Sequence, residues 1–314
     1  MSNRITSLVK AYLDYKHHLG FQMTAESSFL NAFARYTRDI GYTGALTRRI
    51  VFEWCESGDN PSLVTKGRRF EPLKGLADYA AAFDPDSELL PHLPYGNPHK
   101  RIRPHIYTLD ETCRLIDQCD HLYSPDGIRI LTMKTAIGLL WATGLRTSEL
   151  VNLNVQDVDL LEGMLNICSS KFNKDRIVPL PPDVADNLKS YRKQAEQLCG
   201  SARPAGKFFI TTGGRALDRR AFEYAFQKIR DIIDVSDSGY SHARLYDFRH
   251  TFATRTLRNW LEQGADVNAK LFLLSTYMGH THPEDTYWYL SSTPELMALA
   301  SRRYETAYGG AAHE

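Results

Sequence analysis

The sequence predicts a mainly α-helical protein with a small antiparallel β-sheet, built as an N-terminal helical bundle and a larger second domain. Three observations lead to this prediction. The chain has 314 residues, and about 150 residues per domain predicts two domains. Apolar residues recur at helical spacing in the first 83 residues and again after Pro182. Residues 158–180, by contrast, have the shorter rhythm of β-strands.

The composition is that of a folded protein. Hydrophobic residues make up 43% of the chain and charged residues 24%, which excludes collagen-like, coiled-coil and disordered classes. Lys and Arg (38) balance Asp and Glu (37), so net charge gives no argument for nucleic acid, although a basic groove can lie opposite an acidic face. The five cysteines include no C-x-x-C pair, and we expect them to be reduced and mostly buried.

The N-terminus lacks the apolar core of a signal peptide, and the apolar runs are far shorter than the roughly 20 residues of a membrane-spanning helix. We therefore expect a cytoplasmic protein that does not enter a membrane.

Residues 1–84 are expected to form a bundle of about four helices. Apolar side chains step by three and four residues, at Leu8, Tyr12, Tyr15 and Leu19, at Phe29, Phe33, Tyr36 and Ile40, and at Leu73, Leu76, Ala80 and Phe83. Gly20, Gly41 and the cluster from Gly58 to Pro61 separate these segments. Several prolines then interrupt the pattern, so we expect residues 85–105 to connect the two domains.

The second domain, residues 106–314, begins with the capping box Thr108-Leu-Asp-Glu111, which predicts a helix to about Leu122. Another helix is expected to end at Thr143-Gly144. Three short strands follow, at residues 158–160, 165–169 and 176–180, with turns at 161–163 and 171–175. The helical rhythm then returns, and the last part of the chain predicts an amphipathic C-terminal helix over residues 293–307.

Four places concentrate polar side chains that a packed element does not need. In the first, Arg146 and Glu149 lie where one helix ends and another begins at about Thr147. A guanidinium beside a helix N-terminus can bind an anion, and the carboxylate can brace it. Alone, this pair is more typical of a surface salt bridge.

The other three places are the turn around Lys171, the helix start from Tyr246 to His250, and Gly279-His280 with Tyr289 nine residues later. Alone, the first is typical of a solubilising charge, the second of an amphipathic helix and the third of aromatic packing. Beside Lys171, two further cations are equally typical of solubilising charges, namely Lys174 and Arg176. No third ligand with convincing spacing accompanies His280 and His282, so we expect no metal site.

Taken together, the four motifs resemble those of the tyrosine recombinase family, which includes phage integrases and Xer-like enzymes. They are Ala142-Thr-Gly-Leu-Arg146-Thr-Ser-Glu-Leu150, Ser170-Lys171-Phe-Asn-Lys-Asp-Arg-Ile-Val-Pro-Leu180, Phe248-Arg249-His-Thr-Phe-Ala-Thr254, and Met278-Gly-His280 with Tyr289. Their order and spacing match over about residues 105–305. The resemblance implies a recombinase catalytic domain, and the N-terminal bundle is similar in architecture to the family's core-binding domain, which clamps DNA.

The resemblance implies that a tyrosine attacks a DNA backbone phosphate, leaving a 3′-phosphotyrosyl bond and a free 5′-hydroxyl without metal, nucleotide or other cofactor. By motif, the nucleophile is Tyr289, and the phosphate-site residues are Arg146, Lys171, Arg249 and His280. Lys171 would protonate the departing 5′-oxygen. The assignment makes chemical sense, because a phenol of pKa near 10 costs about 4 kcal/mol to ionise at pH 7, and fixed guanidiniums stabilise a pentavalent transition state.

One position departs from the family pattern. Three residues before the second arginine the family usually has His, sometimes Lys, whereas this chain has Tyr246. A phenol donates a hydrogen bond but is a poor proton acceptor at neutral pH, where an imidazole accepts readily. His250 or His242 could compensate.

DNA contact is expected from local basic patches, at Lys100, Arg101, Arg103, Lys174, Arg219 and Arg220. The resemblance also implies a homo-tetramer on two double-stranded DNA sites, acting with or without other recombinases in integration or transposition of a mobile element. The C-terminal helix would then link neighbouring subunits; the alternative is that its own domain covers its apolar face. Two alternatives stay open: a DNA-binding accessory or regulatory protein with impaired catalysis, and a relaxing enzyme similar to type IB topoisomerases.

Overall fold

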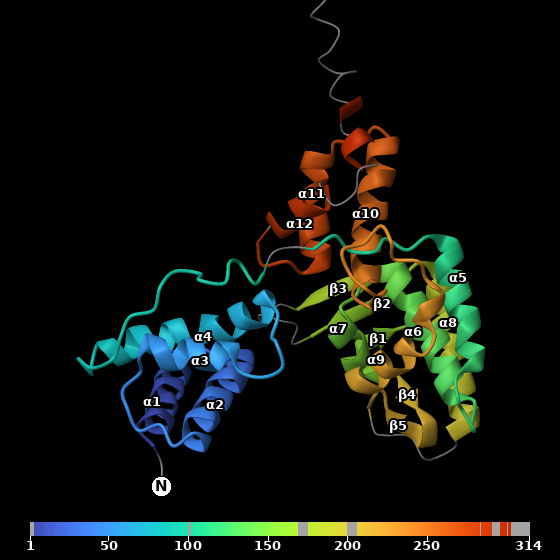
Figure 1. Ribbon diagram of the computed structural model, residues 1–314. Coiled ribbons are helices and arrows are strands. Elements are labelled where there is room, and N and C mark those ends of the chain that lie inside the picture. Colours follow the sequence, from blue (N-terminus) through green and yellow to red (C-terminus); the bar gives the residue numbers. More distant parts are fainter. Residues whose placement is uncertain are drawn as a thin grey trace, which may run out of the picture. The chain divides into compact units, whose positions relative to one another are not determined.

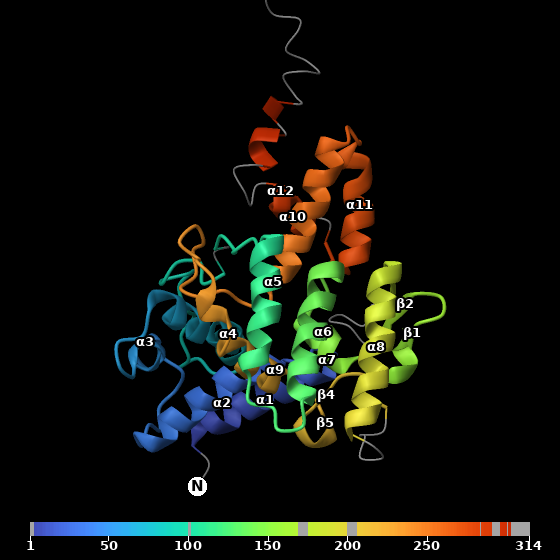
Figure 2. The ribbon, with the colours of Figure 1, turned by 90° about the vertical axis from the view of Figure 1, so that its right-hand side faces the viewer.

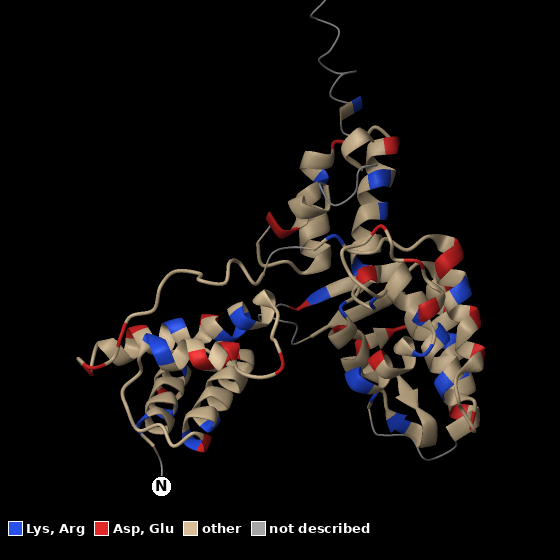
Figure 3. Cartoon of the chain, in the orientation of Figure 1, with Lys and Arg blue, Asp and Glu red and all other residues tan. Residues whose placement is uncertain are grey.

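The chain divides into two compact units, Met1–Arg101 and Ile102–Glu314 (Figure 1). The computed structural model describes residues 3–99, 102–168, 175–199, 206–282, 284–290, 296–299 and 301–302. Both units are dominated by helices, and two small antiparallel sheets lie in the second unit. This confirms the predicted fold class. Lys and Arg positions are interspersed with Asp and Glu positions on each unit (Figure 3), as the balanced composition requires.

The first unit contains the predicted four helices, which are α1 (Arg4–His18), α2 (Thr24–Asp39), α3 (Arg48–Glu56) and α4 (Leu63–Ala81). Their shared core includes the buried side chains of Phe33, Trp54 and Leu73. The periodicity is wrong at its ends, because Leu19 is 53% and Phe83 77% exposed. Leu19 directly follows the last residue of α1, and Phe83 lies two residues after the last residue of α4, where helical spacing no longer fixes the direction of a side chain.

The segment that the sequence presents as a connector packs, on each side of residues 100–101, against its own unit. Leu90 belongs to the core of the first unit, and Glu88 accepts a hydrogen bond from the backbone N–H of Arg48. On the other side, Tyr107 is buried in the second unit and stacks on Phe248 with ring centroids 4.1 Å apart. Most of this proline-rich segment is therefore part of one unit or the other.

Helix α6 (Ile128–Thr143) is the centre of the second unit, packed against α5 (Leu109–Gln118), α8 (Pro182–Cys199), α9 (Arg219–Gln227) and α10 (Asp247–Glu262) (Figure 2). The predicted capping box of α5 is present, since Thr108 and Glu111 exchange side-chain to backbone hydrogen bonds. Because α6 is apolar on most of its faces, it takes the buried central place.

The predicted three-stranded sheet has the order β1 (Val158–Asp159), β2 (Met164–Ile167) and β3 (Arg176–Pro179), all antiparallel. Its register pairs Ile167 with Arg176 across the turn. A second hairpin, β4 (Ile210–Thr211) with β5 (Arg215–Ala216), was not predicted, because strands of two residues show no alternation. Short 3-10 turns complete the unit at Cys119–His121, Val155–Asp157, Thr212–Gly214 and Arg230–Ile232.

The last elements are α10, α11 (Val267–Met278) and α12 (Glu284–Leu290), which pack together with their own apolar cluster (Figure 1). Of the predicted helix over 293–307, residues 296–299 and 301–302 are described, and they are helical. Leu296 is buried in the same cluster, whereas Met297 is 53% exposed. Part of this segment is thus covered by its own unit.

The five cysteines form no disulfide in this structure. Cys113 and Cys168 are exposed and Cys199 is half-buried, so the prediction of mostly buried thiols was wrong. Among the described residues, the helices are all too short or too polar to cross a membrane.

Candidate active site

Arg146 and Glu149 lie at the junction between α6 and the short helix α7 (Thr147–Asn152). The turn depends on Gly144, whose φ is +62° and whose missing Cβ would lie 2.7 Å from the ring of Phe252. The predicted brace is present: Arg146 Nη1 donates to Glu149 Oε1 at 2.7 Å, and its backbone N–H donates to Oε2 at 2.9 Å. Both side chains are largely buried, so this is not the surface salt bridge of the alternative interpretation.

Arg176, at the start of β3, is a member of the cluster that the sequence analysis missed. Its two terminal nitrogens donate to the two carboxylate oxygens of Glu149 at 2.9 and 2.8 Å. Its side chain is 9% exposed, so the interpretation as a solubilising charge was wrong. Burial alone would raise the pKa of Glu149, but the hydrogen bonds and charges of Arg176 and Arg146 outweigh it and hold that pKa at about 2.

Arg249 enters the site from the first turn of α10 and is 1% exposed. Its Nη1 donates to the carbonyl of Gly144 at 3.0 Å, and its Nη2 donates to the carbonyl of Met278. These carbonyls belong to the C-terminal ends of α6 and α11, where helices lack internal partners and have negative dipole ends. The guanidinium is therefore fixed by two helix ends at once.

His280 follows the left-handed Gly279 that ends α11. Its Nδ1 lies 2.8 Å from the hydroxyl of Thr286, which is 1% exposed. Burial, followed by the positive charges of Arg249 and Arg146, lowers the pKa of His280 to about 4. The imidazole is consequently neutral at pH 7, with one N–H to donate.

Tyr289 lies on α12 and is 3% exposed. Its ring is stacked on that of His280, with centroids 6.0 Å apart, and tilted against that of His250 at 5.5 Å. Burial raises the pKa of Tyr289 to about 12, although the neighbouring Arg249 acts in the opposite direction. The phenol is thus buried in the apolar cluster of α10–α12, on the side where His280, His250 and Arg249 lie.

Tyr246 and His250 lie one turn apart at the start of α10, with ring centroids 5.1 Å apart. Tyr246 is 44% exposed, and the ring of His250 is in contact with the rings of both Tyr246 and Tyr289. His242, the other histidine considered from the sequence, is exposed.

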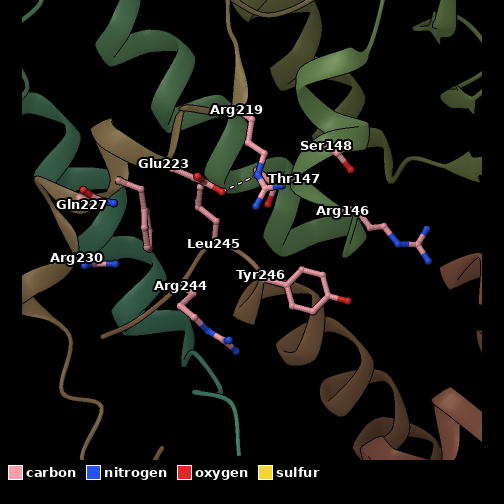
Figure 4. Close-up of a pocket in the computed structure, with 11 residues that line it drawn as sticks. Arg146, Thr147, Ser148, Arg219, Glu223, Gln227, Arg230, Arg244, Leu245 and Tyr246 are labelled. Carbon is pink, nitrogen blue, oxygen red and sulfur yellow. Dashed lines mark hydrogen bonds and ion pairs between the residues drawn. The ribbon is translucent and has the colours of Figure 1, made fainter. Parts of the chain in front are cut away.

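A cavity of about 430 Å³ opens beside Arg146 and Tyr246, lined by four arginines and one carboxylate (Figure 4). The arginines are Arg146, Arg219, Arg230 and Arg244, and the carboxylate is Glu223, which pairs with Arg219 at 2.7 Å. Sequence patterns did not single out Arg230 and Arg244, because they come together only through the fold. Arg220 and Arg103 are exposed elsewhere on the unit.

Four predicted residues lie outside the described part of the chain, namely Lys100, Arg101, Lys171 and Lys174. Within the described ranges, no group of three His, Cys, Asp or Glu side chains is arranged to hold a metal ion.

The family model described as the phage integrase family matches residues 106–295 of this chain. The integrase/recombinase homologue y4rE of Sinorhizobium fredii (strain NBRC 101917 / NGR234) is 31% identical over 295 residues, covering 94% of both chains. A second homologue from the same strain, y4rB, is 33% identical and covers 95% of this chain and 96% of its own. The tyrosine recombinase XerD of Ralstonia nicotianae (strain ATCC BAA-1114 / GMI1000) is 33% identical over 51% of this chain and 50% of its own.

Solved structures agree on the fold. The Tn1549 transposon integrase in complex with transposon right end DNA has a TM-score of 0.67 at 16% identity, covering 95% of this chain and 98% of its own. The XerH site-specific recombinase bound to palindromic difH substrate has a TM-score of 0.62 at 19% identity, covering 90% and 80%. The chain belongs to the phage integrase family of tyrosine recombinases, enzymes that break and rejoin DNA strands.

Proposed function

We propose that this protein is a site-specific DNA recombinase that cleaves and rejoins DNA through a 3′-phosphotyrosyl intermediate at Tyr289. The observation that supports the proposal most strongly is the convergence on one site of Arg146, Arg249, His280 and Tyr289, which come from four separate segments of the chain. A packed core does not need such a cluster. Binding of a phosphate anion explains the cluster, since the anion offsets the repulsion between neighbouring cations.

In this proposal the two arginines bind the non-bridging oxygens of the scissile phosphate. Arg146 and Arg249 are already fixed by backbone carbonyls and by Glu149, so little reorganisation is needed when charge builds up in the transition state. His280 donates a further hydrogen bond as a neutral imidazole, because its pKa of about 4 leaves it uncharged at pH 7.

The phenol oxygen of Tyr289 attacks phosphorus while the bond from phosphorus to the 5′-oxygen breaks. With a pKa of about 12, ionising Tyr289 in advance at pH 7 would cost about 7 kcal/mol. The proton therefore leaves during attack, and we assign His250 as its acceptor because it lies against the Tyr289 ring. Lys171 gives its proton to the 5′-oxygen, and a different 5′-hydroxyl later reverses the sequence without ATP.

The arginine-lined cavity supports DNA binding next to this centre. Three of its arginines, Arg219, Arg230 and Arg244, lie beyond the catalytic cluster. Glu223 pairs with Arg219 and Asp247 pairs with Arg244, so arginines outnumber carboxylates here. Backbone phosphates are the part of DNA that such a site attracts irrespective of sequence. We propose that the DNA strand continues from the scissile phosphate into this cavity.

A second candidate function is DNA binding with impaired catalysis, which Tyr246 favours because its exposed phenol is a poor proton acceptor. A topoisomerase-like relaxing activity would share the covalent step but exchange no partners. Assembly of four copies on two DNA sites is a further part of the proposal, and loss of concentration-dependent assembly on truncation after Ser292 would support it.

The test uses nicked duplexes cut from the genomic DNA that flanks the gene, incubated with the protein in EDTA. We expect a covalent protein–DNA adduct with the wild-type chain and none with Tyr289→Phe, which removes one oxygen from a buried ring. Tight binding without adduct would instead establish the DNA-binding candidate. Recombination between two sites on one plasmid then separates a recombinase from a relaxing enzyme.

A further inference from the structure

Three consecutive carbonyls at the C-terminal end of α11 each accept a hydrogen bond from a different arginine. Arg176 Nε donates to Tyr277 at 2.7 Å, Arg249 Nη2 donates to Met278, and Arg146 Nη2 donates to Gly279 at 2.8 Å. The last carbonyls of a helix have no partner within it and are at its negative end. The end of α11 is therefore a shared acceptor for the guanidiniums of the site.

Arg176 differs from the other two arginines in how its nitrogens are used. Nε is bonded to Tyr277, and both terminal nitrogens are bonded to Glu149, at 2.9 and 2.8 Å. All three nitrogens thus have partners inside the protein. Glu149 in turn accepts two hydrogen bonds from Arg146. Arg176 is therefore linked through one intervening side chain to Arg146, which we place on the phosphate.

We infer that Arg176 is a positioning residue of the recombinase site, which fixes Arg146 through Glu149 and fixes His280 through the end of α11. The inference rests on the proposed function and names a residue that acts through others without touching DNA. Arginine is required because three donors in one plane meet a carboxylate and a carbonyl together, whereas a lysine has a single rotatable ammonium.

The glycine in Met278-Gly-His280 fits this role. A Cβ on Gly279 would lie 3.0 Å from Arg176 Nη1 and 3.2 Å from its guanidinium carbon, and the φ of Gly279 is +65°. Glycine therefore leaves the space that the guanidinium fills, and it lets the backbone turn so that His280 enters the site. The Arg176 side chain on β3 thus packs directly against the glycine turn that precedes His280.

The experiment measures single-turnover formation of the Tyr289 adduct on a nicked duplex for Arg176→Gln, Arg176→Lys and the control Leu188→Ala. Leu188 is 1% exposed on α8, a helix that contributes no residue to the cluster, so its truncation weakens the core without altering the site. Each variant gives a rate, a reactive fraction and a DNA dissociation constant.

A positioning role predicts that Arg176→Gln slows the reaction about 100-fold, because a displacement of about 1 Å suffices for such a loss. The reactive fraction and the DNA dissociation constant should stay near those of the wild-type chain, and Arg176→Lys should recover only part of the rate. A purely structural role predicts instead a smaller reactive fraction at unchanged rate, as for Leu188→Ala. That result overturns the inference, as does a multiplicative loss when Arg176→Gln is combined with Arg146→Lys.

A second readout needs no DNA. The backbone N–H groups of Gly279 and His280 donate to the carbonyls of Thr276 and Ser275, both at 3.0 Å, and their hydrogen exchange reports the order of this turn. Exchange should become faster in Arg176→Gln and stay unchanged in Leu188→Ala. A wild-type chain that forms no adduct refutes the proposed function, whereas unchanged exchange in Arg176→Gln refutes this inference.

Discussion

The imidazole of His250 lies against the ring of Tyr289, with centroids 5.5 Å apart and planes at 59°. Tyr289 needs a proton acceptor, because burial has raised its pKa to about 12. We therefore expect His250→Gln to slow adduct formation by about 100-fold, a typical contribution of general base catalysis. His242→Gln, at an exposed position, is the matched control and should react at the wild-type rate. Equal rates for the two variants would exclude His250 as the acceptor.

Tyr246 offers a test of the departure from the family pattern. Its ring lies 5.1 Å from that of His250, so Tyr246→His places a second imidazole beside the proposed proton acceptor. We expect this variant to react about tenfold faster, since an imidazole accepts a proton near neutral pH, and to be less sensitive to His250→Gln. Tyr246→Phe separates the contribution of the hydroxyl. Slower cleavage by Tyr246→His would show that the phenol has a role of its own.

Thr286 is expected to hold His280 in its reactive orientation. Its hydroxyl lies 2.8 Å from Nδ1 of the neutral imidazole, and donation to Nδ1 leaves the Nε2 proton for the phosphate. Thr286→Val keeps the shape but removes the hydroxyl, so the adduct rate should fall about tenfold, or about 1.4 kcal/mol. Thr276→Val removes a hydroxyl that bonds only to the carbonyl of Phe272 and should change nothing. A normal rate for Thr286→Val would show that the tautomer is fixed by other means.

Sequence patterns predicted those features of this molecule that depend on residues close together in the chain. The capping box at Thr108 and the end of α6 at Gly144 were predicted correctly, because both are decided within a few residues. The brace between Arg146 and Glu149 was predicted for the same reason. Arg176 was not, since its partners Glu149 and Tyr277 lie 27 and 101 residues away in the chain.

The same limit applies to the cavity. Arg219 was expected to touch DNA from its place in a basic pair, but nothing in the sequence separates it from Arg220. The fold separates them, because only one of these two residues lines the cavity beside Arg146. Burial is also a tertiary property, and this is why a phenol chosen by motif, Tyr289, has a strongly raised pKa that its sequence neighbours do not suggest.

This separation gives a matched pair of charge variants on one helix. Arg219→Gln should reduce the slope of log K against log salt for DNA binding by about 1, as expected when one phosphate contact is lost. Arg220→Gln removes the same charge at the next position and should leave the slope near that of the wild-type chain. Binding measured between low and moderate salt on one duplex decides the point. Equal reductions of the slope in the two variants would show that the DNA backbone does not run preferentially through the cavity.

Glu149 makes the stability of the second unit dependent on pH. Its pKa falls from 4.5 to about 2 on folding, so its ion pairs stabilise the folded unit fully above about pH 5 and are lost as the pH falls toward 2. The shift corresponds to about 3 kcal/mol of unfolding free energy.

Denaturant titrations across this range should show that loss of stability when Glu149 is intact. A Trp54→Phe background restricts tryptophan fluorescence to the second unit. In Glu149→Gln the slope should be flatter while overall stability is lower at neutral pH, because Arg146 and Arg176 then lack their anionic partner. Parallel pH profiles for the two proteins would mean that other carboxylates, and not this buried one, control the acid sensitivity of the unit.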